Sequence, residues 1–538
     1  MVSRVRQTPR GELDPFEIEV FRHRLAAVAE EMGVVLRRSG FSANVKERRD
    51  YSCAVFDARG QLVAQAAHIP VHVGSMQLAV EAALARRKPG RGDVILLNDP
   101  FAGGTHLPDV TLVAPVYLPR GRLPLGFVAA RAHHADMGGN FPGSMGLAQE
   151  IYQEGLRLPP VHLVRAGRLC EDILTLFEAN TRVAHERRGD VFAQLAALRI
   201  GAVRLRELAS AVGMARLRSA MAALQDYSER RLRSVLQSLP DGVYRARDFL
   251  DDDGMGNVDL RICVAVIVRG DSITFDFSGS APQTRGGVNA NLAITWAAAL
   301  YCLQLLARGE IPANAGLMRP VRLLAPEGTV VNATFPAAVA AGNVETSQRI
   351  VDTILRALAR AAPDTVPAAS CGSMNNLAIG GVVPGPNTQF AYYETIGGGA
   401  GGGPHLPGAS GVHTHMTNTM NTPIEAVEAQ FPLRVTRYSI RRRSGGKGRH
   451  PGGDGIVREI EALAPVTASI LTERRRHPPW GLWGGGAARR GRNWLRRHAQ
   501  KGRDGERLLP AKASVMLGVG DRLRIETPGG GGWGKSQG

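Results

Sequence analysis

The sequence predicts a mixed α and β fold, with central sheets, long helices and a glycine-rich, β-containing C-terminal region. Hydrophobic residues make up 44% of the 538 residues, which allows a large core. Residues 171–239 are almost free of Gly and Pro and have helical periodicity, whereas residues 441–538 combine short strand patterns with many glycines. The pattern specifies no topology. We expect one unit with three regions, residues 1–250, 251–440 and 441–538.

Local signals place the individual elements. The first helix is predicted from Asp14 to about Arg38, because Asp14 can cap it and Pro15 suits its first turn. Residues 258–277 are predicted to form a hairpin. Residues 171–239 should form two or three helices, and further helices are expected at 293–307 and 346–362. Short strands are expected at 52–56, 62–66, 94–97, 126–132, 456–463, 468–471 and 522–526.

Cysteine usage and apolar runs limit the class of protein. The five cysteines are scattered and never in a CxxC spacing, which excludes a disulfide framework and a thiolate zinc site. The N-terminal residues show no apolar segment of a signal peptide. The longest apolar run, residues 292–307, is shorter than the roughly 20 apolar residues of a membrane span. We therefore expect a soluble, cytoplasmic protein.

Charge is the unusual feature of the composition. Lys and Arg total 66 against 48 Asp and Glu, and only six of the 66 are lysines. Dense arginine runs occur at 441–443, 474–476 and 489–503, but no zinc finger, RNP motif or basic heptad accompanies them. We therefore expect a solvated basic surface and no nucleic-acid partner.

Two H-x-x-D motifs form the densest group of potential metal ligands. His106 and Asp109 belong to the segment NDPFAGGTHLPD, and His133 and Asp136 to HHADMGG, and each segment follows a predicted strand. Pro108 favours a turn at the first motif. If the two strands are neighbours, their ends bring the four side chains together. Imidazole and carboxylate without thiolate suit Zn²⁺, Mn²⁺ or Fe²⁺. Two such motifs also arise by chance among 14 histidines, so a structural role stays open.

Other candidate residues have weaker signals. Asp50 closes the charged run KERRD, for which a solvated surface is the alternative. His413 and His415 alternate on one face of a segment, where a pocket wall and a structural role are equally open. The glycine run 397–403 has N–H groups that could face an anion. It matches neither a Walker A motif nor a dinucleotide fingerprint, and tight turns are the alternative.

Several segments together resemble a known family. They are KERRDYS from Lys46, IPVHVGSM from Ile69, NDPFAGGTHLPD from Asn98, HHADMGG from His133, DFSGS from Asp276, HMTNT from His415, PPWG from Pro478 and TPGGGGWG from Thr527. Over about residues 14–534, the chain resembles the hydantoinase B family. That family includes the B-type chains of N-methylhydantoinase, the C-terminal half of 5-oxoprolinase, and the metal-bearing subunits of acetone and acetophenone carboxylases.

The resemblance implies a division of labour between two subunits. An A-type partner uses ATP to phosphorylate the substrate, and the B-type chain completes the reaction at a divalent Zn, Mn or Fe ion. Carried over position by position, the metal ligands are His106, Asp109, His133 and Asp50. The remaining assignments place Asp136 and Asp99 behind the ligands, Glu154 or His415 as proton carriers, and Gly397, Gly398, Gly399 and Gly401 around the phosphorylated group.

The function implied by the resemblance is that of the metal-dependent B-type chain of an ATP-dependent cyclic-amide hydrolase, of the hydantoinase or 5-oxoprolinase type. We expect a hetero-oligomer with the hydantoinase A-type ATP-binding chain, a small-molecule substrate, and no membrane partner. One alternative is the metal-bearing chain of an ATP-dependent ketone carboxylase. Another is a non-catalytic, arginine-rich chain that serves binding.

Overall fold

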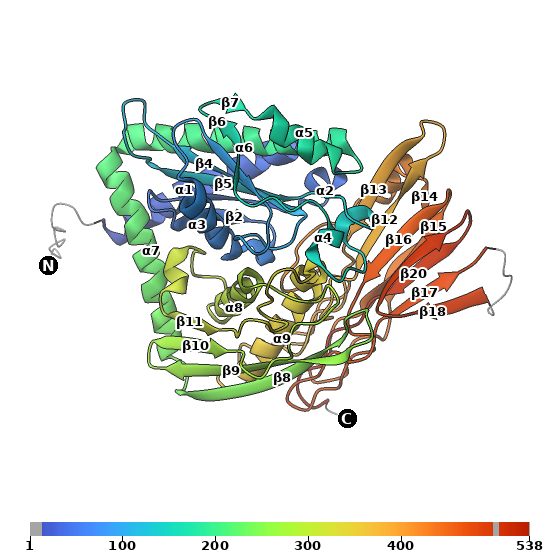
Figure 1. Cartoon of the computed structure of the whole chain (residues 1–538). Helices are drawn as coiled ribbons and strands as arrows, with labels where there is room; N and C mark the ends of the chain where they lie inside the picture. The colour runs from blue at the N-terminus through green and yellow to red at the C-terminus, as the bar shows by residue number, and fades with distance from the viewer. Residues whose placement is uncertain (1–12, 499–504, 537–538) are drawn as a thin grey trace.

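The computed structural model describes residues 13–498 and 505–536, and it has the mixed α and β architecture predicted from the sequence. Its strands form four sheets, of seven, four, four and five strands. In Figure 1 the N-terminal sheet lies above the first four-stranded sheet, with helices α8 (Leu292–Leu306) and α9 (Ser347–Leu358) between them, and the two C-terminal sheets lie at the right. None of the helices in the described ranges combines the length and apolar character that crossing a membrane requires.

The seven-stranded sheet is antiparallel and is covered by helices on both faces. Cys53 and Val55 pack with α1 and α6, whereas Ala54 and Phe56 pack with α3, because successive strand residues point to opposite faces. The Asp14 carboxylate caps α1 as predicted, by accepting the Glu17 N–H. The strands, in the order β2-β1-β5-β4-β3-β6-β7, are β1 Tyr51–Phe56, β2 Leu62–Ala67, β3 Val94–Leu97, β4 Asp109–Val116, β5 Gly126–His133, β6 Val161–Arg165 and β7 Arg168–Leu169. The helices are α1 Pro15–Ser39, α2 Ala43–Lys46, α3 Ser75–Arg87, α4 Ile151–Glu154, α5 Glu171–Ala179, α6 Ala184–Val212 and α7 Met214–Gln237.

The predicted strands 94–97 and 126–132 are not direct neighbours, because β4 lies between them. The sequence pattern did not reveal β4, which begins at Asp109. In the ladder between β4 and β5, Asp109 lies directly opposite His133. The two H-x-x-D motifs therefore meet through β4.

The remaining three sheets contain the predicted hairpin and the short strands predicted for the C-terminal region. Both expected region boundaries, at residues 250 and 440, fall inside strands, so neither separates one sheet from the next. The first sheet consists of β8 Gly242–Asp252, β9 Val258–Arg269, β10 Ser272–Asp276 and β11 Val321–Leu324. The second consists of β12 Asn376–Val383, β13 Thr388–Glu394, β16 Val466–Leu471 and β19 Lys512–Leu517. The third consists of β14 Leu433–Arg441, β15 Gly455–Ala462, β17 Arg492–Arg496, β18 Glu506–Leu509 and β20 Arg522–Glu526, with helix α10 Ile424–Gln430 before it.

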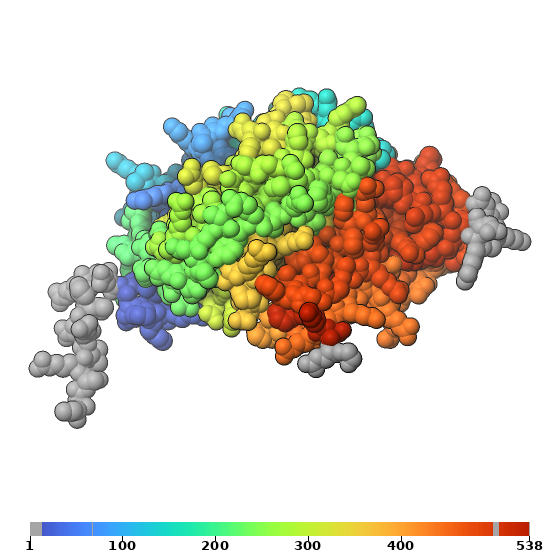
Figure 2. Space-filling view, turned by 90° about the horizontal axis from the view of Figure 1, so that it is seen from below, coloured from blue at the N-terminus to red at the C-terminus, as the bar shows by residue number. Residues whose placement is uncertain are grey.

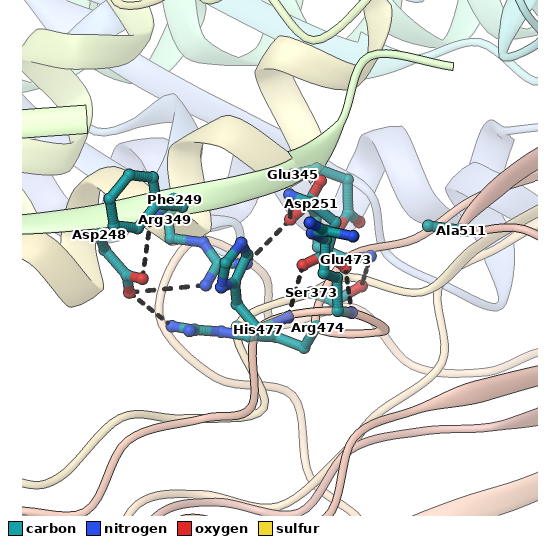
Figure 3. Close-up of polar contacts among 12 residues, drawn as sticks. Asp248, Phe249, Asp251, Glu345, Arg349, Ser373, Glu473, Arg474, His477 and Ala511 are labelled. Atoms are coloured by element: carbon teal, nitrogen blue, oxygen red, sulfur yellow. Dashed lines mark hydrogen bonds and ion pairs between the residues drawn. The ribbon is translucent and has the colours of Figure 1, made fainter. Parts of the chain in front are cut away.

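A buried network of charged side chains fastens the C-terminal region to the middle of the chain (Figure 3). Asp248 of β8 accepts a hydrogen bond from Arg474 at 3.0 Å and lies 3.5 Å from Arg349 of α9. Glu473 accepts from Arg349 at 2.9 Å and from Lys512 of β19 at 2.7 Å. All five side chains are buried. Removal of one partner from such a group costs about 3–5 kcal/mol, because a buried charge then lacks its counterpart.

Glycine backbones in the C-terminal half pack against one another at very short range. Gly399 donates its N–H to the carbonyl of Pro528, and Gly530 donates to that of Gly453. A Cβ added at Gly399 would lie 2.0 Å from the Gly453 oxygen, which no side chain tolerates. Only glycine therefore allows these segments to approach.

Gly399→Ala tests this packing. Because the clash is with backbone, the substitution should destabilise the chain by about 3 kcal/mol or more. Gly403→Ala is a matched control in the same run, since an added Cβ there meets nothing nearer than 3.7 Å. The control should change stability by less than about 0.5 kcal/mol. Urea unfolding of both variants measures the difference, and equally small effects would contradict the packing argument.

Candidate functional site

The two H-x-x-D motifs meet at one end of the seven-stranded sheet, where four buried side chains gather. His106 lies on the predicted turn before β4, and its Nε2 is 3.3 Å from Oδ2 of Asp109. Nε2 of His72 is 3.5 Å from Oδ1 of the same carboxylate. The ring centroids of His106 and His133 are 5.0 Å apart. Asp109 thus lies between two histidines and opposite a third.

Four polar atoms of this group are buried without a hydrogen-bond partner among the described residues. They are Nδ1 and Nε2 of His106, Oδ1 of Asp109 and Nε2 of His133. The contacts of 3.3 and 3.5 Å to Asp109 are too long or too bent to satisfy them. Each such atom costs about 1–3 kcal/mol. Three neighbouring side chains with unpartnered atoms indicate that a further group binds among them.

A small cavity of about 20 Å³ lies beside this group, and it has room for about one water molecule. Asp50, which the family resemblance implied as a fourth ligand, lines it with Asp109 and His133. Its other walls come from distant parts of the chain, including Val71, His72, Asn343, Val344, Met374, Tyr393, Thr395, Thr417 and Thr419. The fold thus brings three of the four predicted metal ligands to one cavity, with His106 beside it.

The donor chemistry of the cluster fits a transition-metal ion, since imidazole and carboxylate are its usual ligands where thiolates are absent. Within residues 13–498 and 505–536, however, no group of three or more His, Cys, Asp and Glu side chains has an arrangement that could hold a metal ion. The cluster therefore offers suitable donors, but its side chains must shift before they can surround an ion.

Burial and neighbouring charges set the protonation of the cluster. Burial raises the pKa of Asp109, but His106 and His72 outweigh this effect and hold the pKa well below its ordinary value. Burial, followed by the charge of His106, lowers the pKa of His133 well below its ordinary value. Burial raises the pKa of Asp50. An ionised Asp109 beside a neutral His133 is the state in which both groups bind a cation.

Residues from two distant segments hold the ring of His133. Nδ2 of Asn44 lies 3.2 Å from its Nδ1, and the ring of Tyr393 in β13 stacks on it at 4.8 Å. The guanidinium of Arg48 lies 4.7 Å from the centre of the Tyr393 ring, on which it packs. The adjacent His134 instead forms a contact with helix α6. These contacts leave only Nε2 of His133 for a further partner.

Three residues of this site were not predicted from the sequence. His72 stands in the segment IPVHVGSM, which contributed to the resemblance but received no role. Asn343 belongs to a π-helical segment, Gly342–Thr346, and its buried carboxamide oxygen has no partner in the described part of the chain. π-Helical turns often occur at functional sites. No local pattern connects Asn343 or Tyr393 with the histidine motifs, so only the fold brings them together.

The structure corrects the roles predicted for Asp136 and Asp99. Asp136 does not contact His133; its carboxylate pairs with Arg182 at 2.9 Å. Asp99 pairs with Arg157 at 3.0 Å. Both carboxylates also accept backbone N–H groups of the loops that follow their strands. They brace those loops, and Asn44 takes the place expected for Asp136 beside His133.

Neither predicted proton carrier contacts the cluster in the described structure. One carboxylate oxygen of Glu154 accepts the N–H groups of Val339 and Ala340, both at 2.8 Å. Burial raises the pKa of Glu154 to about 8, although these two hydrogen bonds lower it. His415 lies 3.3 Å from Asp352, within the buried charge network rather than beside the cavity. Both residues hold the fold around the site, and their catalytic roles stay predictions.

The glycine run that was predicted to hold a phosphorylated group is packed against other backbone. Gly398 and Gly399 donate their N–H groups to backbone carbonyls, so the prediction is wrong for these two. A Cβ added at Gly397 or Gly401 would meet backbone atoms at 3.0 and 1.9 Å. The four glycines serve close packing.

A comparison with protein families matches residues 14–536 to the family described as Hydantoinase B/oxoprolinase. The chain is 34% identical to the putative B-type chain of a D-/L-hydantoinase from Pseudomonas sp. (strain NS671), over 88% of this chain and 82% of that protein. It is 39% identical to 5-oxoprolinase 1 of Arabidopsis thaliana, over 97% of this chain. It spans only 42% of the length of that oxoprolinase.

Two solved structures have the same fold. The ATP-dependent caprolactamase from Pseudomonas jessenii is 29% identical with a TM-score of 0.89, over 97% of this chain and 91% of that chain. Acetone carboxylase, in a nucleotide-free structure, is 19% identical with a TM-score of 0.87, over 97% and 76%. At this lower identity the likeness shows the fold alone.

The buried Glu154 leads to a prediction about pH. Its pKa in the folded chain, about 8, exceeds the ordinary value of 4.5, so the folded state retains a proton that the unfolded state releases between these values. Stability should therefore fall as the pH rises from about 5 to about 8, by up to about 1.4 kcal/mol per pH unit from this group.

Glu154→Gln should flatten this fall, and Glu327→Gln, which removes an exposed carboxylate, should leave it unchanged. Urea unfolding across this pH range measures both variants beside the parent chain. Identical pH dependence for Glu154→Gln and the parent would show that Glu154 is not the group responsible.

Proposed function

Because this chain belongs to the hydantoinase B/oxoprolinase family, we propose that it is the metal-dependent B-type chain of an ATP-dependent cyclic-amide hydrolase. The observation that carries the proposal is the buried group of His106, Asp109 and His133, whose unpartnered atoms lie beside a small cavity. The similarity to an ATP-dependent caprolactamase supports the substrate class, since a lactam is a cyclic amide.

In this proposal His106, Asp109 and His133 hold a transition-metal ion, with Asp50 as a fourth donor. When bound, such an ion lowers the pKa of coordinated water toward 7 and withdraws electrons from a substrate oxygen. The protonation states of two ligands in the described structure favour binding of a cation. The ionised carboxylate of Asp109 attracts the cation, and the low pKa of His133 keeps its ring uncharged, so that the ring does not repel the cation.

Positioning of the substrate falls to the walls of the cavity. The unpartnered carboxamide oxygen of Asn343 can accept an N–H of the ring. The hydroxyls of Thr395 and Thr419 lie 2.7 Å apart on the same wall, and the apolar side chains of Val344 and Met374 exclude bulk water. Hydrogen bonds gain strength where water is excluded. With a volume of about 20 Å³, the cavity must open before it can admit a ring.

The ATP-using step is assigned to an A-type partner. The hydantoinase relative is named as the B-type chain of its enzyme, whereas the oxoprolinase relative is a longer single chain of which this chain spans 42%. In the proposed system the partner phosphorylates the ring amide and the cluster described above completes its hydrolysis. A hetero-oligomer follows if the partner is a separate chain.

Co-expression with an A-type partner chain tests the function. The pair should open hydantoin, 5-oxoproline or caprolactam only with ATP, and the purified chain should contain about one metal ion. His106→Ala and Asp109→Asn should each lower metal content and ring opening at least about ten-fold, because each removes a ligand. His185→Ala, which removes an exposed histidine, is the matched control and should retain both.

Full metal content and activity in His106→Ala would refute the proposed site. Ring opening without ATP would refute the division of labour. ATP turnover on ketones that depends on bicarbonate would instead assign the chain to carboxylation, which the fold alone also permits.

Asn343→Leu tests the positioning role. Loss of one hydrogen bond of about 1.4 kcal/mol should lower kcat/KM for ring opening about ten-fold, while metal content and Tm stay at the parent values. Asn140→Leu, at an exposed position, is the control and should have the parent kcat/KM. An unchanged kcat/KM in Asn343→Leu, or loss of the metal with it, would contradict a role in substrate positioning.

A further inference from the structure

Members of each of the three dense arginine runs line one cleft that the proposed function does not use. The cleft has a volume of about 900 Å³, within the usual range of small-molecule sites. One wall comes from the end of β8 and the start of β9, and the others come from the C-terminal region. Figure 2 shows the green surface of β8 and β9 meeting the orange-red surface of that region. The arginines that line the cleft are Arg441, Arg475, Arg476, Arg489, Arg490 and Arg492.

Only two of these arginines have a carboxylate partner among the described residues. Arg476 pairs with Asp259 at 2.6 Å, and Arg441 pairs with Glu526 at 3.2 Å. The guanidinium of Arg475 donates only to neutral oxygens, and its buried Nε has no partner. Among these six arginines, three have side chains without any hydrogen bond or ion pair in the described structure. They are Arg489, Arg490 and Arg492.

The acidic residues of the cleft compensate these charges only in part. Asp251 accepts the backbone N–H groups of residues 475–477. Asp252 lies 3.6 Å from Lys512, and Glu526 is shared between Arg441 and Arg524. Six arginines face three acids in the lining, so the cleft keeps an excess of positive charge.

The arginines are close enough to repel one another. Burial lowers the pKa of Arg441; the charge of Glu526 raises it, and the charges of Arg492 and Arg489 lower it. Burial lowers the pKa of Arg475 to about 10; the charges of Glu345 and Asp251 raise it, and the charge of Arg441 lowers it. Like charges held together in a partly enclosed space favour binding of an anion, which removes this repulsion.

We propose that this cleft binds a phosphate-bearing small molecule with more than one phosphate group, at a site separate from the histidine cluster. The planar guanidinium presents paired N–H donors that match phosphate oxygens, which makes arginine the preferred residue for such ligands. Four guanidiniums without carboxylate partners suit a ligand that carries several negative charges. The proposal does not depend on the hydrolase function.

Isothermal titration of the purified chain with tripolyphosphate tests the proposal. The parent chain should bind one tripolyphosphate per chain and bind inorganic phosphate more weakly. The triple variant Arg489→Ala, Arg490→Ala, Arg492→Ala should bind tripolyphosphate at least about ten-fold more weakly, since charge-assisted contacts are lost. The matched control is Arg120→Ala, Arg122→Ala, Arg230→Ala, which removes three exposed arginines without ion pairs in the described structure. It should bind within about two-fold of the parent.

Three results would overturn the proposal. The first is absence of stoichiometric binding to the parent chain. The second is equal weakening in the control, which would mean that net charge alone attracts the anion. The third is tighter binding of an acidic peptide than of tripolyphosphate, with the same dependence on Arg489, Arg490 and Arg492, which would assign the cleft to an acidic protein segment. Because the substituted side chains are exposed, an unchanged Tm confirms that each variant is folded.

Discussion

Close contact between glycine backbones determines where the C-terminal half of the chain lies, and the candidate site depends on that position. Gly399 follows β13 closely in sequence and is fixed by its hydrogen bond to Pro528, with no space for a Cβ. Tyr393 stands near the end of β13 and stacks on His133 of the N-terminal sheet. A shift of these glycine segments would therefore move the ring that holds His133. The motifs of the N-terminal half need the C-terminal half to become a site.

Buried charged side chains hold another part of the wall of the cavity beside the histidines. Glu345 lies in the π-helical segment that carries Asn343, and it accepts the Met374 N–H at 2.9 Å and the Asn376 side chain at 2.7 Å. Arg349, one turn further along, is bound by Asp248 and Glu473. These contacts fix Asn343 and Met374 on opposite segments of the cavity wall. Burial, followed by the charge of Glu473, raises the pKa of Glu345 to about 8, so the network tolerates a carboxylic acid there without a full counter-charge.

Local signals predicted much of this fold and the centre of the site, and the family implied by the motifs is confirmed. The Asp14 cap, the hairpin at 258–277 and the turn at Pro108 depend on neighbouring residues, and all are present. Contacts between distant residues were not predictable in this way. Asp136 pairs with Arg182 rather than orienting His133, and consecutive glycines have the same pattern whether they bind an anion or pack against backbone. Only the segment that packs against the glycines distinguishes these cases, and that segment cannot be identified from the local sequence.

The position of the arginines also depends on contacts between distant residues. Exposed arginines without ion pairs, such as Arg120 and Arg230, also lie elsewhere in the described structure, but members of all three dense runs meet at one cleft. The member of that group that is most enclosed, Arg475, donates to Asn375 at 2.7 Å, and the neighbouring Met374 lines the cavity beside the histidines. Contacts through Asn375 and Met374 therefore connect the arginine cleft with the cavity beside the candidate metal centre. An anion held in the cleft would place its charge near these contacts, so at this place part of the arginine excess is arranged as a binding site and is more than a uniform surface property.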